Sequence, residues 1–279
     1  MPGTQEDNRR DHGVLSGAEL VNPYDDSRAK TAQVEQMFDS IAPAYDFMNG
    51  AMSFGMHRSW QHKALSAAGS VLAASPARIL DIATGTGEVA FELAHRYPEA
   101  KVTGLDLSEK MLDVARGKLS RLSDKSRRLI SFEQGDCLQL RFADLSFDLV
   151  TVAYGVRNFE HLEDGLREML RVLTPGGTIC ILELSEPVAP LTKAAYRFYS
   201  RRLIPFVGRI VSGDSKAYSY LPQSIAAAPQ RDRLCDILRR VGFDGCSWRS
   251  MSMGAVTYYL AHKPDKQFTE TDNHSNSAR

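Results

Sequence analysis

The chain has 279 residues, in which 34 Lys and Arg balance 34 Asp and Glu, so its formal net charge at pH 7 is zero. This balance argues against a protein whose main task is to hold nucleic acid, because that task needs a surplus of basic side chains. The sequence has no run of about 18 uninterrupted apolar residues, which excludes a helix that spans a membrane.

Both ends of the chain are polar and carry too little apolar area to offset the entropy of ordering. We expect disordered tails over residues 1–30 and 265–279, a helical cap over 31–76 and a core over 77–264. In the cap, the apolar pattern predicts one helix over residues 34–48 and a second over 57–74. Neither belongs to a strand–helix repeat, so both are placed to cover a ligand crevice.

From residue 77 onward, the pattern predicts strands that alternate with helices. The predicted strands are Arg78–Ile82, Lys101–Asp106, 129–134, Phe147–Ala153 and 178–184. Helices follow the first, second and fourth of these strands, and a longer one is predicted over 222–241, with Pro229 inside it and Gly242 as its C-terminal cap. Such alternation demands crossover connections and a parallel sheet covered on both faces. Residues 243–248 and 255–262 have no helix between them and predict a closing antiparallel hairpin.

Four cysteines stand at wide spacings, at positions 137, 180, 235 and 246. Their spacing fits neither a disulfide-dense scaffold nor a zinc framework. We therefore expect reduced thiols in a cytoplasmic protein. No cluster of His, Cys and acidic residues has ligand spacing, so we expect no metal.

The turn after the first strand contains a glycine-rich loop, Gly85-Thr86-Gly87, that matches the dinucleotide-binding fingerprint. Asp106 ends the next strand, where a carboxylate can accept hydrogen bonds from both hydroxyls of a ribose. These features alone fit an NAD-dependent dehydrogenase as well as a methyltransferase. A tight turn without a ligand is the structural alternative.

Asp81 distinguishes between a dinucleotide and S-adenosylmethionine as the ligand, because it ends the first strand directly before the glycine loop. A pyrophosphate at a helix N-terminus seeks backbone N–H groups and would be repelled by a carboxylate. S-adenosylmethionine has no phosphate, and its ammonium and sulfonium groups are attracted to an acid. The alternative is that Asp81 caps the following helix.

A third acid follows the third strand, in Asp136-Cys137. Asp136 can accept from the adenine amino group, while Cys137 offers its backbone N–H. An Asp-initiated turn is the structural alternative. Three acids that end three successive strands line the edge where open α/β sheets bind ligands. The methyl donor is therefore favoured over nicotinamide.

Several motifs also resemble a known family. Residues 81–87 resemble the first motif of class I S-adenosylmethionine-dependent methyltransferases, and residues 170–177 look like their late helix-turn-strand motif. Residues 38–49, 53–60, 155–158 and 213–222 resemble the quinone-biosynthesis C-methyltransferases more narrowly. The spacing of their entry motif is kept by Tyr45, Asp46, Asn49, Ser53, His57 and Trp60. The resemblance covers about residues 34–263.

This resemblance implies a Rossmann-like α/β fold with a seven-stranded, mostly parallel sheet, helices on both faces and an N-terminal helical cap. It implies methyl transfer from S-adenosylmethionine to a ring carbon of a demethylmenaquinol, with the benzoquinol of ubiquinone synthesis as the alternative acceptor. Thr86, Asp106, Asp136 and Cys137 fall on the family's donor-binding positions. An NAD-dependent dehydrogenase and a non-catalytic assembly protein are alternatives of other classes.

Carbon methylation needs a proton acceptor and a group that stabilises a phenolate. Arg157 is the candidate for the electrostatic role, and Asn158 for orienting a water or a quinol hydroxyl. His57 is the candidate general base, and Tyr45 of the entry motif is a further candidate. The alternatives are an Arg157 ion pair with Glu160, a packing or capping role for His57, and a helix–helix contact made by Tyr45 and Asp46.

The expected acceptor carries a polyprenyl tail, which calls for an apolar entrance. Residues 196–209 are apolar and aromatic and are interleaved with arginines, a composition that suits a helix at an anionic membrane surface. A helix that covers the sheet or meets a second copy of the chain is the alternative. We therefore expect a quinol substrate, peripheral membrane contact or a homodimer, and no nucleic acid.

Overall fold

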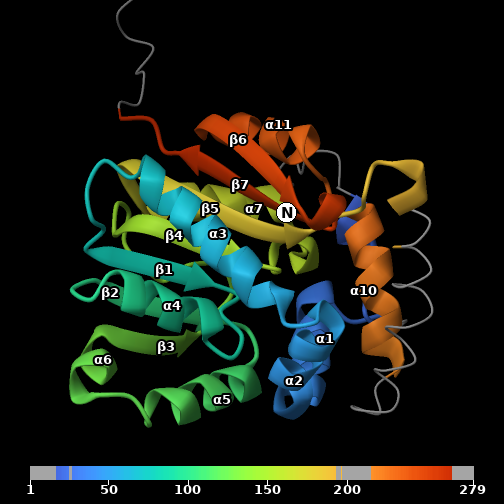
Figure 1. Ribbon diagram of the computed structural model, residues 1–279, viewed down its shortest axis with the longest axis horizontal. Coiled ribbons are helices and arrows are strands. Elements are labelled where there is room, and N and C mark those ends of the chain that lie inside the picture. Colours follow the sequence, from blue (N-terminus) through green and yellow to red (C-terminus); the bar gives the residue numbers. More distant parts are fainter. Residues whose placement is uncertain (1–16, 25–26, 193–195, 197–214, 266–279) are drawn as a thin grey trace, which may run out of the picture.

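The computed structural model describes residues 17–24, 27–192, 196 and 215–265 (Figure 1). Its centre is a seven-stranded sheet of order β3-β2-β1-β4-β5-β7-β6. The strands are β1 (Arg78–Ile82), β2 (Lys101–Asp106), β3 (Ile130–Gln134), β4 (Phe147–Ala153), β5 (Leu173–Leu184), β6 (Asp244–Met251) and β7 (Val256–His262). The first five strands pair in parallel, and β7 runs antiparallel to β5 and β6. The expected mixed sheet and its closing hairpin are confirmed.

Helices cover both faces of the sheet. A buried cluster on one face joins the strands to α3 (Met56–Val71), α4 (Glu88–Arg96) and α5 (Glu109–Leu119). On the other face, α7 (Leu162–Val172) and α11 (Asp232–Val241) pack against the strands in a second cluster. A short α6 (Asp124–Leu129) leads into β3. The buried strand residues on both faces explain the nearly continuous apolar runs of the sequence.

The cap lies beyond the carboxyl ends of the parallel strands (Figure 1). It contains α1 (Lys30–Ile41), the 3-10 turn η2 (Ala42–Ala44), α2 (Tyr45–Ser53) and the start of α3, with α10 (Ser215–Ala227) beside them. The single helix predicted over residues 34–48 is therefore wrong. Pro43 lies in η2, where the chain turns between α1 and α2. A proline ring removes a backbone donor and so favours such a break.

Part of the predicted N-terminal tail is structured. The 3-10 turn η1 (Gly17–Leu20) buries Ala18, whose carbonyl accepts a hydrogen bond from Lys30 Nζ at 2.5 Å. Glu19 accepts from the backbone N–H of Leu162 at 2.6 Å, at the start of α7. The expectation of disorder is wrong for residues 17–24 and 27–30, because polar contacts with the core hold them. Composition counts apolar area and does not detect such contacts.

Two further expectations near the C-terminus are wrong. The predicted helix 222–241 is two helices, since α10 ends at Ala227 and Pro229 lies in the connection to α11. Cys235 of α11 and Cys246 of β6 form a disulfide, with their Cα atoms 5.6 Å apart, so these two thiols are not reduced. The helix packs on the edge strand and brings them together, which spacing along the chain does not reveal. In the described residues, no helix combines the length and the apolar character needed to cross a membrane.

Candidate active site

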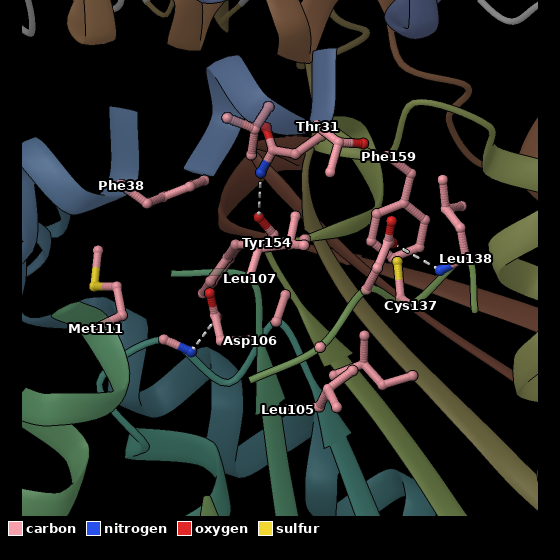
Figure 2. A pocket seen from close by; sticks show the side chains of 18 of the residues that line it. Thr31, Phe38, Leu105, Asp106, Leu107, Met111, Cys137, Leu138, Tyr154 and Phe159 are labelled. Carbon is pink, nitrogen blue, oxygen red and sulfur yellow. Dashed lines mark hydrogen bonds between the residues drawn. The ribbon is translucent and has the colours of Figure 1, made fainter. Parts of the chain in front are cut away.

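A cavity lies at the carboxyl ends of β1 to β4, where open α/β sheets bind ligands (Figure 2). Its floor comes from the residues that follow these strands, and its roof comes from α1 and the first residue of α2. The sheet order changes direction between β1 and β4, which opens a crevice there. We call this space the donor cavity. Its lining includes Ile82, Gly85, Asp106, Asp136, Cys137, Ala153, Tyr154 and Asn158.

Asp106 is held at the edge of the donor cavity by two backbone donors. The N–H of Gly85 donates to Oδ2 at 2.7 Å, and the N–H of Ser108 donates to Oδ1 at 2.9 Å. Each oxygen keeps a lone pair for a further donor such as a ribose hydroxyl. Burial raises the pKa of Asp106 to about 6 despite these hydrogen bonds. The glycine loop and the second acid therefore form one unit.

The loop itself requires glycine. Gly87 has φ +84°, and a Cβ there would lie 2.9 Å from the rings of Phe91 and Phe132. The loop therefore fits only a residue without a side chain. Thr86 is buried, and its hydroxyl donates to Asp46 of α2 at 2.5 Å. Neither Thr86 nor Gly87 is among the residues that line the donor cavity.

Asp136 and Cys137 both line the donor cavity after β3. Asp136 Oδ1 also accepts from the N–H of Leu138 at 2.9 Å, so the Asp-initiated turn is present as well. Burial raises the pKa of the Cys137 thiol well above its ordinary value. The thiol is therefore protonated and acts as an apolar part of the wall.

Asp81 lies beneath the glycine loop and is not among the residues that line the donor cavity. The hydroxyls of Thr84 and Thr151 each donate to one of its oxygens at 2.6 Å. Burial raises its pKa to about 7, against the effect of these two hydrogen bonds. Asp81 of β1 thus connects this strand to Thr151 of β4 and to Thr84 before the glycine loop.

A second, larger cavity of about 440 Å³ lies between the cap helices α1 to α3 and α10. We call it the acceptor cavity. Most of its lining is apolar, and includes Met37, Ile41, Met48, Trp60, Leu184, Ile225 and Val256. Phe38, Tyr45 and Tyr154 line both cavities, so the two spaces meet at these three rings.

Arg157 and Asn158 follow β4 in the 3-10 turn η3 (Val156–Asn158) and are both buried. Arg157 lines the acceptor cavity and pairs with Glu183 of β5, with 2.7 Å between Nη1 and Oε1. Burial opposes its charge, but the Glu183 pair outweighs that effect and leaves the pKa of Arg157 above its ordinary value. The alternative ion pair with Glu160 is wrong, because that carboxylate accepts from the hydroxyl of Thr31 at 2.7 Å.

Asn158 lines the donor cavity and accepts from the Tyr220 hydroxyl of α10 at 3.1 Å. The two residues of the Arg-Asn pair therefore face different cavities. Tyr45 is partly buried at the junction, and desolvation there raises its pKa.

His57 lines the acceptor cavity at the start of α3. Its Nδ1 lies 2.8 Å from the Ser53 hydroxyl, and its Nε2 lies 3.4 Å from Glu88 Oε2. Both ring nitrogens of His57 therefore have a partner. This supports a packing or capping role for His57 more than a role as general base. Asp46 connects the cap to the glycine loop, because its carboxylate accepts a hydrogen bond from the Thr86 hydroxyl. Asp46 lines neither cavity.

Sequence reasoning missed two residues of this site, Tyr154 and Glu183. Glu183 carried a signal, since it is a charged residue inside an otherwise apolar strand and such residues are buried only with a partner. Tyr154 directly precedes the Gly155-Val156-Arg157-Asn158 motif, but nothing in the sequence shows that its ring separates two cavities. Among the described residues, no three His, Cys, Asp or Glu side chains are grouped so that they could hold a metal ion.

The chain is similar in sequence to known methyltransferases. The model of the ubiE/COQ5 methyltransferase family matches residues 26–263. A demethylmenaquinone methyltransferase of Porphyromonas gingivalis is 45% identical, over 89% of this chain and 100% of its own. A protein of the same name from Deinococcus radiodurans is 42% identical, over 88% and 99% of the two chains. A ubiquinone/menaquinone biosynthesis C-methyltransferase of Geotalea daltonii is 40% identical, over 84% and 97%.

Solved structures share the fold at low sequence identity. A possible histamine N-methyltransferase of Thermotoga maritima gives a TM-score of 0.55 at 18% identity, over 82% of this chain and 99% of its own. The [4+2]-cyclase SpnF gives 0.56 at 17% identity, over 84% and 96%. These likenesses confirm the Rossmann-like class I methyltransferase fold expected from the sequence.

Proposed function

This chain belongs to the ubiE/COQ5 methyltransferase family, and from that premise we propose that it transfers a methyl group from S-adenosylmethionine to a ring carbon of demethylmenaquinol, which yields menaquinol. One observation carries the proposal. A cavity at the strand ends, with Asp106 and Asp136 in its wall, adjoins a larger apolar cavity under the cap, and the two meet at three aromatic rings. Such a pair of spaces suits a polar donor and an apolar acceptor that react at their junction.

The donor cavity fits S-adenosylmethionine through its acids. Asp106 would accept from the ribose hydroxyls, because each of its oxygens keeps acceptor capacity beyond its backbone donor. Asp136 would accept from the adenine amino group, and the Cys137 thiol would pack beside the base. Asp81 would act on the donor through the loop it supports, since both of its oxygens are already bonded.

The acceptor cavity fits a fused aromatic ring with the start of an apolar tail. A ring hydroxyl first releases its proton to water and leaves a phenolate, whose electron pair makes the neighbouring carbon nucleophilic. That carbon attacks the methyl group, the C–C bond forms as the S–CH3 bond breaks, and the electrons of that bond stay on sulfur. Tautomerisation then moves the displaced hydrogen from ring carbon to oxygen. Because the methyl group moves in one direct displacement, holding the ring carbon in line with it supplies much of the rate.

Arg157 would stabilise the phenolate, since its buried guanidinium lines the acceptor cavity. Glu183 would keep that guanidinium in place. We propose a positioning role for His57, because its two nitrogens are occupied by Ser53 and Glu88. Asn158 would orient a polar group of the donor, and Tyr45 would shape the junction.

A side-by-side assay tests this proposal. The protein would receive S-adenosylmethionine with a short-chain demethylmenaquinol, or with the matching demethylated benzoquinol, under reducing anaerobic conditions. We expect methylated naphthoquinol by mass spectrometry, and its loss in Asp106→Asn, which keeps the side-chain shape. Preference for the benzoquinol would favour the ubiquinone pathway, which the name of the Geotalea daltonii relative also includes. Binding of S-adenosylmethionine without methylation of either quinol would favour a non-catalytic role. Thermal stabilisation of the protein by NADH, and not by S-adenosylhomocysteine, would favour a dehydrogenase.

We also propose that the mouth of the acceptor cavity meets lipid. Phe54 and Met253 line this cavity, and these two residues are 76% and 78% exposed. A polyprenylated acceptor resides in a membrane, so an apolar rim would let the ring enter while the tail remains in lipid. The segment 196–209 lies outside the described residues except for Tyr196, which lines the same cavity.

A further inference from the structure

Tyr154 has a buried hydroxyl that the fold does not use. Within the described residues this hydroxyl has no hydrogen-bond partner, although its oxygen is shielded from solvent. Buried polar groups in folded proteins are nearly always bonded, because leaving one unpaired costs stability. Such an exception at the junction of two cavities indicates a partner that arrives with a ligand.

The backbone around Tyr154 fixes the direction of its side chain. Tyr154 has φ +58°, an uncommon conformation for a residue with a side chain. Its N–H donates to the carbonyl of Leu182 at 2.7 Å. The next residue, Gly155, admits no Cβ, which would lie 2.7 Å from the Cβ of Ala83. The strand end is thus closely packed against the turn that leads into the glycine loop.

The Tyr154 carbonyl also organises the residues that follow. It accepts hydrogen bonds from Nη1 of Arg157 and, at 3.4 Å, from Nδ2 of Asn158. Its side chain, its carbonyl and the Arg-Asn pair therefore form one structural unit between the donor and acceptor cavities.

The charged and titratable groups that face the Tyr154 hydroxyl come from four elements. They are Glu183 of β5, Tyr45 of α2, Arg157 of η3 and Glu88 of α4. Burial, followed by the charge of Glu183, raises the pKa of Tyr154 above its ordinary value. The phenol therefore stays protonated and can only donate when it meets an anionic oxygen.

On the basis of the proposed function, we propose that the Tyr154 hydroxyl donates a hydrogen bond to the ring oxygen of the acceptor beside the carbon that is methylated. The guanidinium of Arg157 is already balanced by Glu183, so a neutral donor at the junction adds stabilisation where the phenolate charge forms. It also holds that ring oxygen, and with it the neighbouring carbon, at the junction. Tyr154 would thus be a catalytic residue of the methyl transfer.

The test removes the hydroxyl with Tyr154→Phe, and uses Tyr97→Phe, which lies outside both cavities, as the matched control. We expect kcat of Tyr154→Phe to fall about tenfold to hundredfold, while the Kd of S-adenosylhomocysteine stays within about twofold of wild type. The rising limb of the kcat–pH profile should move upward by roughly one unit, because the phenolate loses a hydrogen bond. The control should change neither quantity.

Two readouts do not depend on turnover. The midpoint of thermal unfolding of Tyr154→Phe should equal or exceed that of wild type, because an unpartnered buried hydroxyl is removed. We use 1-naphthol as a probe in place of the quinol because it has a single hydroxyl and is stable to oxidation. The absorbance of 1-naphthol bound to the protein reports the ionisation of this hydroxyl. Its pKa in the complex should be higher in Tyr154→Phe than in wild type.

Each of the following results would overturn the inference. A kcat within twofold of wild type with an unmoved pH limb would show that the hydroxyl does not meet the reacting oxygen. A clear fall in the unfolding midpoint would show a structural hydroxyl instead. If wild type methylates the quinol and the variant does so equally well, only the inference falls. If wild type methylates no quinol, the proposed function falls and the inference falls with it.

Discussion

The carboxylates at the carboxyl edge of the sheet differ in what they do, although they look alike in the sequence. Asp106 and Asp136 reach the donor cavity, whereas Asp81 is enclosed by Thr84 and Thr151. Spacing after a strand predicted where each residue lies, because strand ends meet at one edge of a parallel sheet. It could not predict which carboxylate is exposed to a ligand, because that depends on hydroxyls from elsewhere in the chain.

The same limit applies to Arg157. Its place after β4 was predictable from the motif around it, but its partner was not. Glu183 stands 26 residues away on β5, and it pairs with Arg157 in place of Glu160, the partner considered as an alternative. Charge pairs of this kind form through strand pairing, which local spacing does not encode.

The buried Asp81 predicts a particular pH dependence of stability. Its pKa is about 7 in the folded protein and 3.8 in the reference state, so the folded state holds a proton that the unfolded chain releases. The stabilisation from this proton is complete below about pH 4 and is lost as the pH rises through about 7. Asp81→Asn removes the titration. We expect its free energy of unfolding, relative to wild type, to rise by on the order of 4 kcal/mol across this range, at about 1.4 kcal/mol per pKa unit.

Urea unfolding of both proteins between pH 4 and pH 8 measures this difference. Asp113→Asn, on the exposed side of α5, serves as the control and should show a constant difference from wild type. A constant difference for Asp81→Asn as well would contradict the buried, protonated carboxyl.

At the level of elements, Asp46 is one of several side chains that join the cap to the core by polar contacts. Asp46 of α2 accepts from the Thr86 hydroxyl and pairs with Lys118 of α5, each at 2.5 Å. It therefore connects the cap to the glycine loop and to the second helix of the core. The sequence predicted helices ahead of the first strand, but their break at Pro43 and this connection depended on packing that the apolar period does not resolve.

Loss of the Asp46 connection should loosen the cap. Its side chain is 36% exposed, so solvent screens the pair with Lys118 and its contribution is about 1 kcal/mol. We expect Asp46→Ala to speed amide hydrogen exchange in α2 about fivefold while β1 and β4 stay protected. Exchange followed by mass spectrometry measures this, with Asp113→Ala as a control of equal charge change. Equal exchange in α2 of both variants would exclude Asp46 as the connection.

The disulfide between α11 and β6 gives a second prediction for an element. Cys235 and Cys246 are separated by 11 positions in the chain. Closing a loop of this size restricts the unfolded chain and is worth about 3 kcal/mol. Cys246→Ser should therefore lower the free energy of unfolding by about that amount, and a reducing agent should lower wild type to the same value. Cys180→Ser controls for loss of a buried thiol, since Cys180 is free. An unfolding curve of wild type that does not respond to reductant would contradict the bond.

For the whole molecule, the parallel sheet and the layers of helices on both its faces were predictable from the alternation of strands and helices. The closing hairpin was predictable because no helix separates its strands. The two cavities were not, because their walls combine side chains from the cap, the strand ends and α10. At the rim of the acceptor cavity, this arrangement leaves Phe54 and Met253 exposed.

The exposed rim predicts lipid binding that depends on apolar contact. Replacing Phe54 and Met253 by Ser together should reduce co-sedimentation with liposomes of mixed neutral and anionic phospholipid severalfold. Val71 and Leu122, which are also exposed but lie away from the cavity, provide the matched double-Ser control. Added salt separates the contribution of anionic lipid. Equal sedimentation of the two double variants would remove the lipid contact and leave the enzyme proposal in place.

The central claim is that donor and acceptor occupy adjoining cavities and react where these meet. A crystal structure of the protein with S-adenosylhomocysteine and a short-chain demethylmenaquinol tests it most directly. We expect the adenosine beside Asp106 and Asp136, the quinol ring among the apolar side chains of the cap, and the sulfur facing a ring carbon next to Phe38, Tyr45 and Tyr154. A sulfur directed away from these rings, or a quinol bound outside the cap, would contradict the account.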